Sequence, residues 1–183
     1  MKAHVIDNFL PEEEFNQLCG FITGESSESD QLMPSVPWYY GKVLSQNVKD
    51  YSSPECNEED NYQFSHVFYV ADAPTSGLIQ NLQPLVDAMP EVGCRSFVKI
   101  KANLNPKTDK IIEHGFHVDI WNFEGGKTAI YYVNTNNGYT KFKNGEIIES
   151  VENRLVIFDG SVHHTGTTCT DKHARYVINM NFF

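Results

Sequence analysis

The alternation of apolar and polar residues changes character near residue 95 of this chain. Before that point, apolar side chains recur at helical spacing over residues 12–22, which predicts an amphipathic helix. Pro11 and the three glutamates that follow it are typical of a first helical turn, and Gly24 is a typical end. The same spacing predicts a second helix over residues 76–89.

Short segments with alternating side chains fill most of the remaining chain. Such segments, rich in aromatic and β-branched residues and separated by turn residues, predict strands, and Asn144-Gly145 is typical of a tight hairpin turn. We expect strands over 3–9, 38–44, 64–70, 95–104, 111–120, 128–133, 139–142, 146–151, 154–158 and 175–183. From residue 95 onward these follow one another with no helix between them, which predicts an antiparallel sandwich or barrel.

A length of 183 residues is enough for one domain with a full hydrophobic core. We therefore expect a single domain over 1–183, mainly β with N-terminal helices. Residues 1–94 would form a support region of helices and strands, and residues 95–183 would form the β-core. The polar stretches 24–37 and 50–61 are expected to be exposed loops.

The net charge of −10 argues against a general nucleic-acid partner, because neutralising phosphates requires clustered lysines and arginines. Lys99, Lys101, Lys107 and Lys110 do cluster, and we expect them on a solvated edge or loop. No apolar run has the length of a signal peptide or a membrane span. The cysteines show no C-x-x-C pair, so a zinc knuckle is not expected. These features favour a cytoplasmic protein with reduced thiols.

The strongest candidate chemistry lies in a His-x-Asp pair with a later histidine. On a strand, residues two apart point to the same face, so His117 and Asp119 would project together. His114 competes with His117 but has no carboxylate two residues away. His163 and His164 are adjacent and would point to opposite faces, so only one can join the site. We choose His164, because Arg175 would then lie on the antiparallel neighbour of its strand.

Arg175 opens a segment whose alternation indicates two buried faces. Tyr176, Ile178, Met180 and Phe182 share an apolar face, and Arg175, Val177, Asn179 and Asn181 share the opposite, more polar one. A guanidinium facing a cavity is costly unless it is paired, and its planar fork suits a carboxylate. An anionic ligand is one partner for Arg175, and an acidic residue of the chain is the alternative.

These residues resemble the iron(II)/2-oxoglutarate-dependent dioxygenases, in particular the small prolyl-4-hydroxylase-like type of phages and marine bacteria. The resemblance spans the whole chain and is strongest from 95 to 183. It rests on five elements: His117-Val-Asp119, Ala129-Ile-Tyr-Tyr132-Val-Asn134, Asn137-Gly-Tyr-Thr140-Lys-Phe142, Phe158-Asp-Gly-Ser with His164, and Arg175. Two departures from the pattern of the superfamily stand out. Asn137-Gly138 replaces the usual Gly-Gly, and Asn181 stands where the nucleic-acid dealkylases have a second arginine.

The resemblance implies a double-stranded β-helix, also called a jelly roll, with iron at its open end. It implies that His117, Asp119 and His164 hold Fe(II), and that Arg175, helped by Tyr132, binds 2-oxoglutarate. The implied reaction uses O2, with ascorbate as a reductant, to hydroxylate a C–H bond and yields succinate and CO2. The implied substrate is a peptide residue, prolyl by analogy, or a small molecule.

A second reading of the same residues is a cupin-like β-barrel metalloprotein that does not use 2-oxoglutarate. In that case Arg175 would have a partner within the protein. Asn103 and Trp121 are further candidates to line the pocket. The loops 24–37 and 50–61 and the segment 121–126 would set substrate choice. We expect these segments to close over the site, with Gly125-Gly126 as a hinge.

Overall fold

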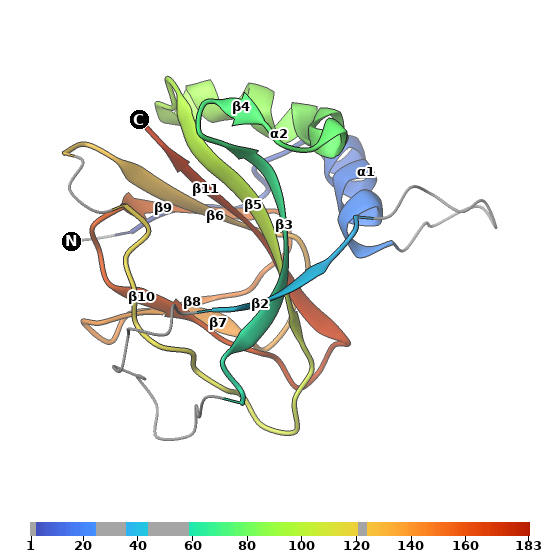
Figure 1. Cartoon of the computed structure of the whole chain (residues 1–183), viewed down its shortest axis with the longest axis vertical. Coiled ribbons are helices and arrows are strands. Elements are labelled where there is room, and N and C mark those ends of the chain that lie inside the picture. Colours follow the sequence, from blue (N-terminus) through green and yellow to red (C-terminus); the bar gives the residue numbers. More distant parts are fainter. Residues whose placement is uncertain (1–2, 25–35, 44–58, 121–123) are drawn as a thin grey trace.

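Two antiparallel sheets face each other in the computed structural model, which describes residues 3–24, 36–43, 59–120 and 124–183 (Figure 1). The large sheet contains, in spatial order, β1 (His4–Ile6), β9 (Arg154–Asp159), β6 (Lys127–Tyr132), β11 (Ala174–Phe182), β5 (Phe97–Pro106), β3 (Tyr62–Val70) and β2 (Tyr39–Lys42), with β4 (Ala73–Pro74) paired to β3. The small sheet has the order β10 (His164–Gly166), β7 (Tyr139–Phe142) and β8 (Ile147–Glu149). This arrangement confirms the predicted mainly β fold with a jelly-roll core.

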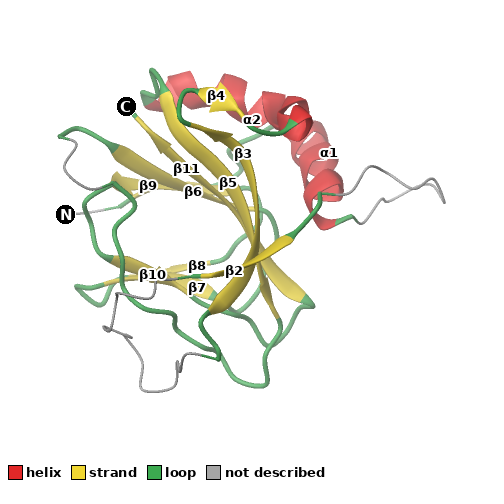
Figure 2. Ribbon diagram, viewed as in Figure 1, coloured by secondary structure: helices red, strands yellow, loops and turns green. Residues whose placement is uncertain are grey.

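The helices cover the face of the large sheet that points away from the small sheet (Figure 2). The first, α1 (Glu12–Thr23), ends at Gly24 in the left-handed conformation, as the sequence predicts. The second predicted helix lies where the sequence places it, but it is not one continuous α-helix. It consists of a 3-10 helix η1 (Gly77–Leu82), a short α2 (Gln83–Ala88) and a 3-10 helix η2 (Met89–Val92). No helix in the described ranges is long and apolar enough to cross a membrane.

The alternation of β11 divides the hydrophobic core in two. Ile178, Met180 and Phe182 pack against the helices, whereas Val177 packs between the sheets with side chains such as Phe158. Both faces of this strand are therefore buried, as its alternation predicts. The same alternation turns Arg175, Asn179 and Asn181 toward the space between the two sheets.

Two expectations about connectivity are wrong. Residues 111–120 form no regular strand and make only isolated bridges, in which Glu113 pairs with Thr167 and His117 with His164. Arg175 does not lie on a strand paired with that of His164, because β11 pairs with β5 and β6, whereas β10 pairs with β7. His164 and Arg175 approach each other from opposite sheets.

Parts of the polar segments predicted to be loops, and most of the predicted lid, lie outside the described residues. These parts are 25–35, 50–58 and 121–123, the last of which includes Trp121. The proposed closure over the site, with Gly125-Gly126 as a hinge, stays a prediction.

Candidate metal centre and anion pocket

His117 and His164 face each other across a backbone bridge. The amide of each residue donates a hydrogen bond of 3.0 Å to the carbonyl of the other. In such an antiparallel pair the opposed side chains project to the same side, and the two ring centroids are 4.6 Å apart. This bridge holds the two imidazoles together although the segment around His117 is not a regular strand.

Asp119 completes a compact three-residue cluster. Its Oδ1 lies 3.8 Å from His117 Nε2, and its Oδ2 lies 3.6 Å from His164 Nε2. One potential ligand atom from each of the three residues lies within 4.8 Å of the others. Two imidazole nitrogens and one carboxylate oxygen on a single face suit Fe(II) and leave its opposite coordination positions open. The structure thus brings together the three residues that the sequence proposes as metal ligands.

Hydrogen bonds fix the orientation of both imidazoles. Nδ1 of His117 lies 3.2 Å from the Gly115 carbonyl oxygen, and Nδ1 of His164 lies 3.0 Å from that of Val162. A carbonyl can only accept, so in each neutral ring Nδ1 donates and Nε2 keeps its lone pair for a metal. Burial, reinforced by the charge of His164, lowers the pKa of His117 to about 4, which keeps this ring neutral near pH 7.

The carboxylate of Asp119 is held by three donors from the large sheet. Its Oδ2 accepts hydrogen bonds from Asn179 Nδ2 at 2.9 Å, Thr128 Oγ1 at 3.2 Å and Asn181 Nδ2 at 3.3 Å. Burial alone would raise the pKa of Asp119, but the neighbouring His164 and His117 hold it well below its ordinary value. Asp119 is therefore an ionised, fixed ligand group. Sequence reasoning missed this role of Asn179, although the alternation of β11 signals its position.

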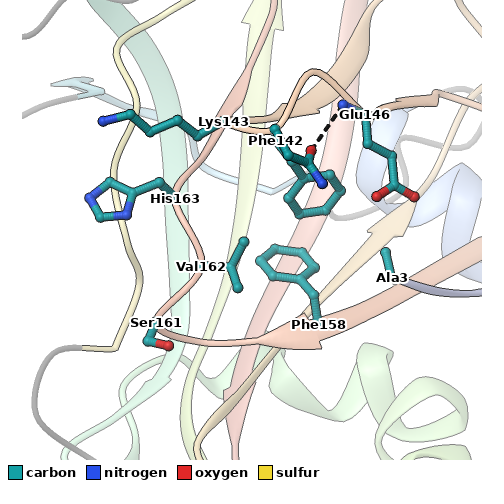
Figure 3. A pocket seen from close by; sticks show the side chains of 9 residues that line it. Ala3, Phe142, Lys143, Glu146, Phe158, Ser161, Val162 and His163 are labelled. Carbon is teal, nitrogen blue, oxygen red and sulfur yellow. Dashed lines mark hydrogen bonds between the residues drawn. The ribbon is translucent and has the colours of Figure 1, made fainter. Parts of the chain in front are cut away.

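His163, the rival of His164, lies outside this cluster. His163 is exposed and lines a separate hollow of about 300 Å³ with Val162, Phe142 and Phe158 (Figure 3). Its ring points away from the facing rings of Phe142 and Phe158 in that view. Phe158 packs its ring 4.8 Å from that of His164. The two neighbouring histidines thus line different cavities.

His114 lines the same cavity as the cluster but is almost fully buried, with 1% of its surface exposed. Burial, with the charges of Arg175 and His117, lowers its pKa to about 4. The pKa of an unfolded histidine is about 6.5, so between pH 6.5 and 4 the unfolded chain binds a proton that the folded chain does not.

This difference predicts loss of stability in acid. The contribution of His114 is complete above pH 6.5, and it disappears as pH falls toward 4, at up to about 1.4 kcal/mol per pH unit. We expect the unfolding free energy from urea titrations to fall less steeply between pH 6.5 and 5 in His114→Asn than in the wild type. An identical slope in both proteins would contradict a neutral, buried His114.

Arg175 lies in the cavity beside the cluster with only 2% of its surface exposed. Its Nε donates to Ser150 Oγ at 2.8 Å and its Nη2 donates to Thr140 Oγ1 at 3.2 Å. Burial lowers the pKa of this guanidinium from its ordinary value. Within the described part of the chain no carboxylate forms an ion pair with Arg175, whereas Lys127, Lys141 and Arg154 each have one. A buried cation of this kind calls for an anion.

Tyr132 lies behind this arrangement and does not line the cavity. Its hydroxyl donates to Thr140 Oγ1 at 2.8 Å, and the Arg175 guanidinium carbon lies 5.5 Å from its ring centroid. Because Thr140 Oγ1 accepts from both residues, its own proton can point into the cavity. The predicted contact of Tyr132 with a ligand therefore stays a prediction. Thr140, unlike Tyr132, lines the cavity and can donate to a ligand there.

Unsatisfied polar atoms mark the same cavity, whose volume is about 190 Å³. Asn103 and Asn105 line it, and their buried Oδ1 atoms have no hydrogen-bond partner among the described residues. Buried amides are nearly always paired, so these two acceptor oxygens mark a polar cavity with room for a group that donates hydrogen bonds. The fit to a metal ion and an acidic co-substrate rests on the two imidazoles and the carboxylate of the cluster and on Arg175, which has no ion-pair partner in the described ranges. Asn103 is where the sequence analysis expects it.

Gly138 allows Arg175 to occupy its place. A Cβ at this position would lie 2.6 Å from the Thr168 carbonyl oxygen and 2.7 Å from Arg175 Cδ. We therefore expect Gly138→Ala to cost about 1–3 kcal/mol of unfolding free energy and to weaken anion binding at Arg175. Chemical denaturation and ligand titration would measure the two effects. Gly77→Ala, whose added Cβ meets nothing within 4 Å, is the matched control, and equal behaviour of the two variants would contradict the prediction.

No protein-family model matches the chain, and no curated protein sequence does. Solved structures do match over nearly the whole chain. A prolyl hydroxylase from Trichoplax adhaerens, in complex with a peptide fragment of the hypoxia inducible factor oxygen degradation domain, aligns with a TM-score of 0.64 and 15% identity over 99% of this chain and 83% of that one. A Pseudomonas putida prolyl-4-hydroxylase aligns with a TM-score of 0.60 and 15% identity, covering 98% and 91%.

A third similar structure is the viral collagen prolyl hydroxylase of Paramecium Bursaria Chlorella virus-1 in its 2OG complex, with a TM-score of 0.56, 11% identity and coverage of 100% and 96%. The chain therefore shares the fold of the 2-oxoglutarate/iron(II) oxygenases, as the sequence resemblance implies. The three solved structures named above are prolyl hydroxylases.

Proposed function

We propose that this protein is an Fe(II)- and 2-oxoglutarate-dependent dioxygenase that hydroxylates a C–H bond of a peptide residue, prolyl by analogy, or of a small molecule. One observation carries the proposal. The buried Arg175, with no acidic partner in the described chain, shares a cavity with His117, Asp119 and His164. A metalloprotein that did not use an acidic co-substrate would have no need for a buried guanidinium beside its metal.

In this proposal each residue has a defined task. His117, Asp119 and His164 hold Fe(II) through Nε2 and carboxylate atoms. Arg175 and the Thr140 hydroxyl bind the distal carboxylate of 2-oxoglutarate, and Tyr132 orients Thr140. When bound, iron, 2-oxoglutarate and O2 supply the oxidising chemistry, with succinate and CO2 as products and ascorbate as an auxiliary reductant.

The chain itself positions the metal ligands and excludes water from the cavity. Asn179, Thr128 and Asn181 fix the Asp119 carboxylate, and the two backbone carbonyls fix the imidazole planes. Ile130 and Val177 provide apolar walls in the same cavity. Such preorganised groups need little rearrangement when substrate arrives. The peptide bound by the Trichoplax structure supports a peptide as one class of substrate.

Succinate production tests the proposal. The wild-type protein, incubated with Fe(II), 2-oxoglutarate and ascorbate, should form succinate slowly even without the primary substrate, and His117→Ala and Arg175→Ala should form none above background. His163→Ala, which removes an exposed imidazole next to the site, should behave as the wild type. Metal-loaded wild-type protein that fails to bind 2-oxoglutarate would overturn the proposal and favour the cupin-like alternative.

A further inference from the structure

Two lysines line the cavity where the sequence analysis expects a solvated edge. Lys99 and Lys101 lie on β5 and are both half-buried in the cavity wall, whereas Lys107 and Lys110 are exposed. Lys101 stands opposite Asn179, and Lys99 stands opposite Asn181. Paired residues on neighbouring strands point to the same face, so the two lysines share the face that carries the Asp119 donors. The expectation of a solvated edge is wrong for this pair.

The surroundings of these lysines contain little negative charge. Neither makes an ion pair with a carboxylate in the described ranges, in a chain that carries 24 acidic residues and 14 lysines and arginines. Burial and the charge of Lys99 lower the pKa of Lys101 to about 8, and Asp119 acts against this shift. Asp119 is already engaged by three hydrogen-bond donors and two imidazoles.

The spacing along β5 separates these lysines from Arg175. Arg175 stands opposite Asn105, six residues beyond Lys99 on the same strand, which corresponds to about 20 Å along the sheet. The carbon chain of 2-oxoglutarate has four C–C bonds of about 1.5 Å, so its carboxyl carbons are at most about 6 Å apart. If one carboxylate of 2-oxoglutarate binds Arg175, the other carboxylate can extend along β5 no farther than the metal cluster and Lys101. Lys99 stands opposite Asn181, a donor to Asp119, so along β5 it is the cavity lysine farthest from Arg175.

We propose that Lys99, assisted by Lys101, binds a carboxylate of the primary substrate and so selects an acidic substrate for this site. The substrate is then either a peptide with an Asp or Glu beside the oxidised residue, or a small carboxylic acid. A second anion in the cavity offsets the positive charge of the two lysines and the metal. This inference rests on the proposed function and deepens it, since it assigns one anion to Arg175 and a different one to Lys99.

Binding to the intact protein, loaded with redox-inert Zn(II) and saturated with 2-oxoglutarate, tests this inference by titration calorimetry. The probes are the capped peptide Glu-Pro-Glu and its Gln-Pro-Gln counterpart, and glutarate and its diamide as the small-molecule pair. In at least one pair the acid should bind about tenfold or more tightly than the amide, because a charge-assisted hydrogen bond is worth more than a neutral one. The pair that shows the preference identifies the source of the carboxylate.

Lys99→Gln should abolish this preference and Lys101→Gln should reduce it. Lys127→Gln removes the same charge from a lysine that is paired with Asp159 and should leave the preference unchanged. The inference is overturned if neither acid is preferred over its amide, or if Lys99→Gln weakens 2-oxoglutarate binding as much as Arg175→Gln does. Failure of 2-oxoglutarate to bind the wild type would instead refute the proposed function, so the two failures are distinguishable.

Discussion

An Asp119→Ala variant should bind Fe(II) at least about a hundredfold more weakly than the wild type. Even an outer hydrogen-bond partner of a metal ligand is typically worth 10–100-fold in affinity, and Asp119 provides the only carboxylate of the three-residue cluster in the described chain. Its loss also leaves Asn179 Nδ2 without its acceptor, whereas Asn181 Nδ2 still donates to Thr128 Oγ1. His117→Ala should have a comparable effect.

Graded variants make this prediction specific. Asn179→Ala leaves all three ligands in place but removes the 2.9 Å hydrogen bond to Asp119 Oδ2, so we expect a smaller loss, about 10–100-fold. His163→Ala should bind metal as the wild type does. Anaerobic Fe(II) titration, with Mn(II) as a redox-inert probe, would measure the series. Equal metal affinity in wild type and Asp119→Ala would show that this cluster is not the metal centre.

Local patterns in the sequence predict much of the fold, because they report burial directly. The alternation from Arg175 to Asn181 reveals a strand buried on both faces, and the structure places its polar side chains toward the cavity and its apolar ones toward the helices. Helical spacing also locates the second helical region. Helical spacing does not show that this region is divided at Pro84 and Pro90. Each proline lacks an N–H, so a new helical segment begins there.

Pairing between distant segments is less visible in the sequence. The sequence favours His164 over His163 on the expectation that Arg175 lies on the neighbouring strand, yet His164 and Arg175 lie in opposite sheets. What places the His164 side chain beside His117 is a backbone bridge to the segment around His117. Register of this kind depends on the whole sheet and not on either segment alone. The expectation for Lys99 and Lys101 is wrong because charge alone does not show which side of a strand faces a cavity.

Arg175→Gln should lose 2-oxoglutarate binding by about a hundredfold or more. A guanidinium can donate two charge-assisted hydrogen bonds to one carboxylate, each worth about 1.5–3 kcal/mol, and tenfold in affinity corresponds to about 1.4 kcal/mol. Arg175→Lys keeps the charge but not the planar fork, so we expect it to bind with intermediate affinity. Titration calorimetry of the Zn(II)-loaded proteins would measure all three affinities.

The stability of the ligand-free proteins distinguishes this role of Arg175 from a structural one. Removing one partner of a buried salt bridge typically costs 3–5 kcal/mol. Arg175 has no such partner among the described residues, so Arg175→Gln should unfold with a free energy close to that of the wild type. Saturating 2-oxoglutarate at 100 times its Kd should stabilise the wild type by about 2.7 kcal/mol and the variant far less.

Arg154→Gln supplies the control, because Arg154 is a cation of the same sheet that is paired with Asp7. It should leave 2-oxoglutarate binding intact. If Arg175→Gln instead destabilises the ligand-free protein by several kcal/mol and leaves 2-oxoglutarate affinity unchanged, Arg175 has an acidic partner within the protein. The cavity would then belong to a metalloprotein of another kind.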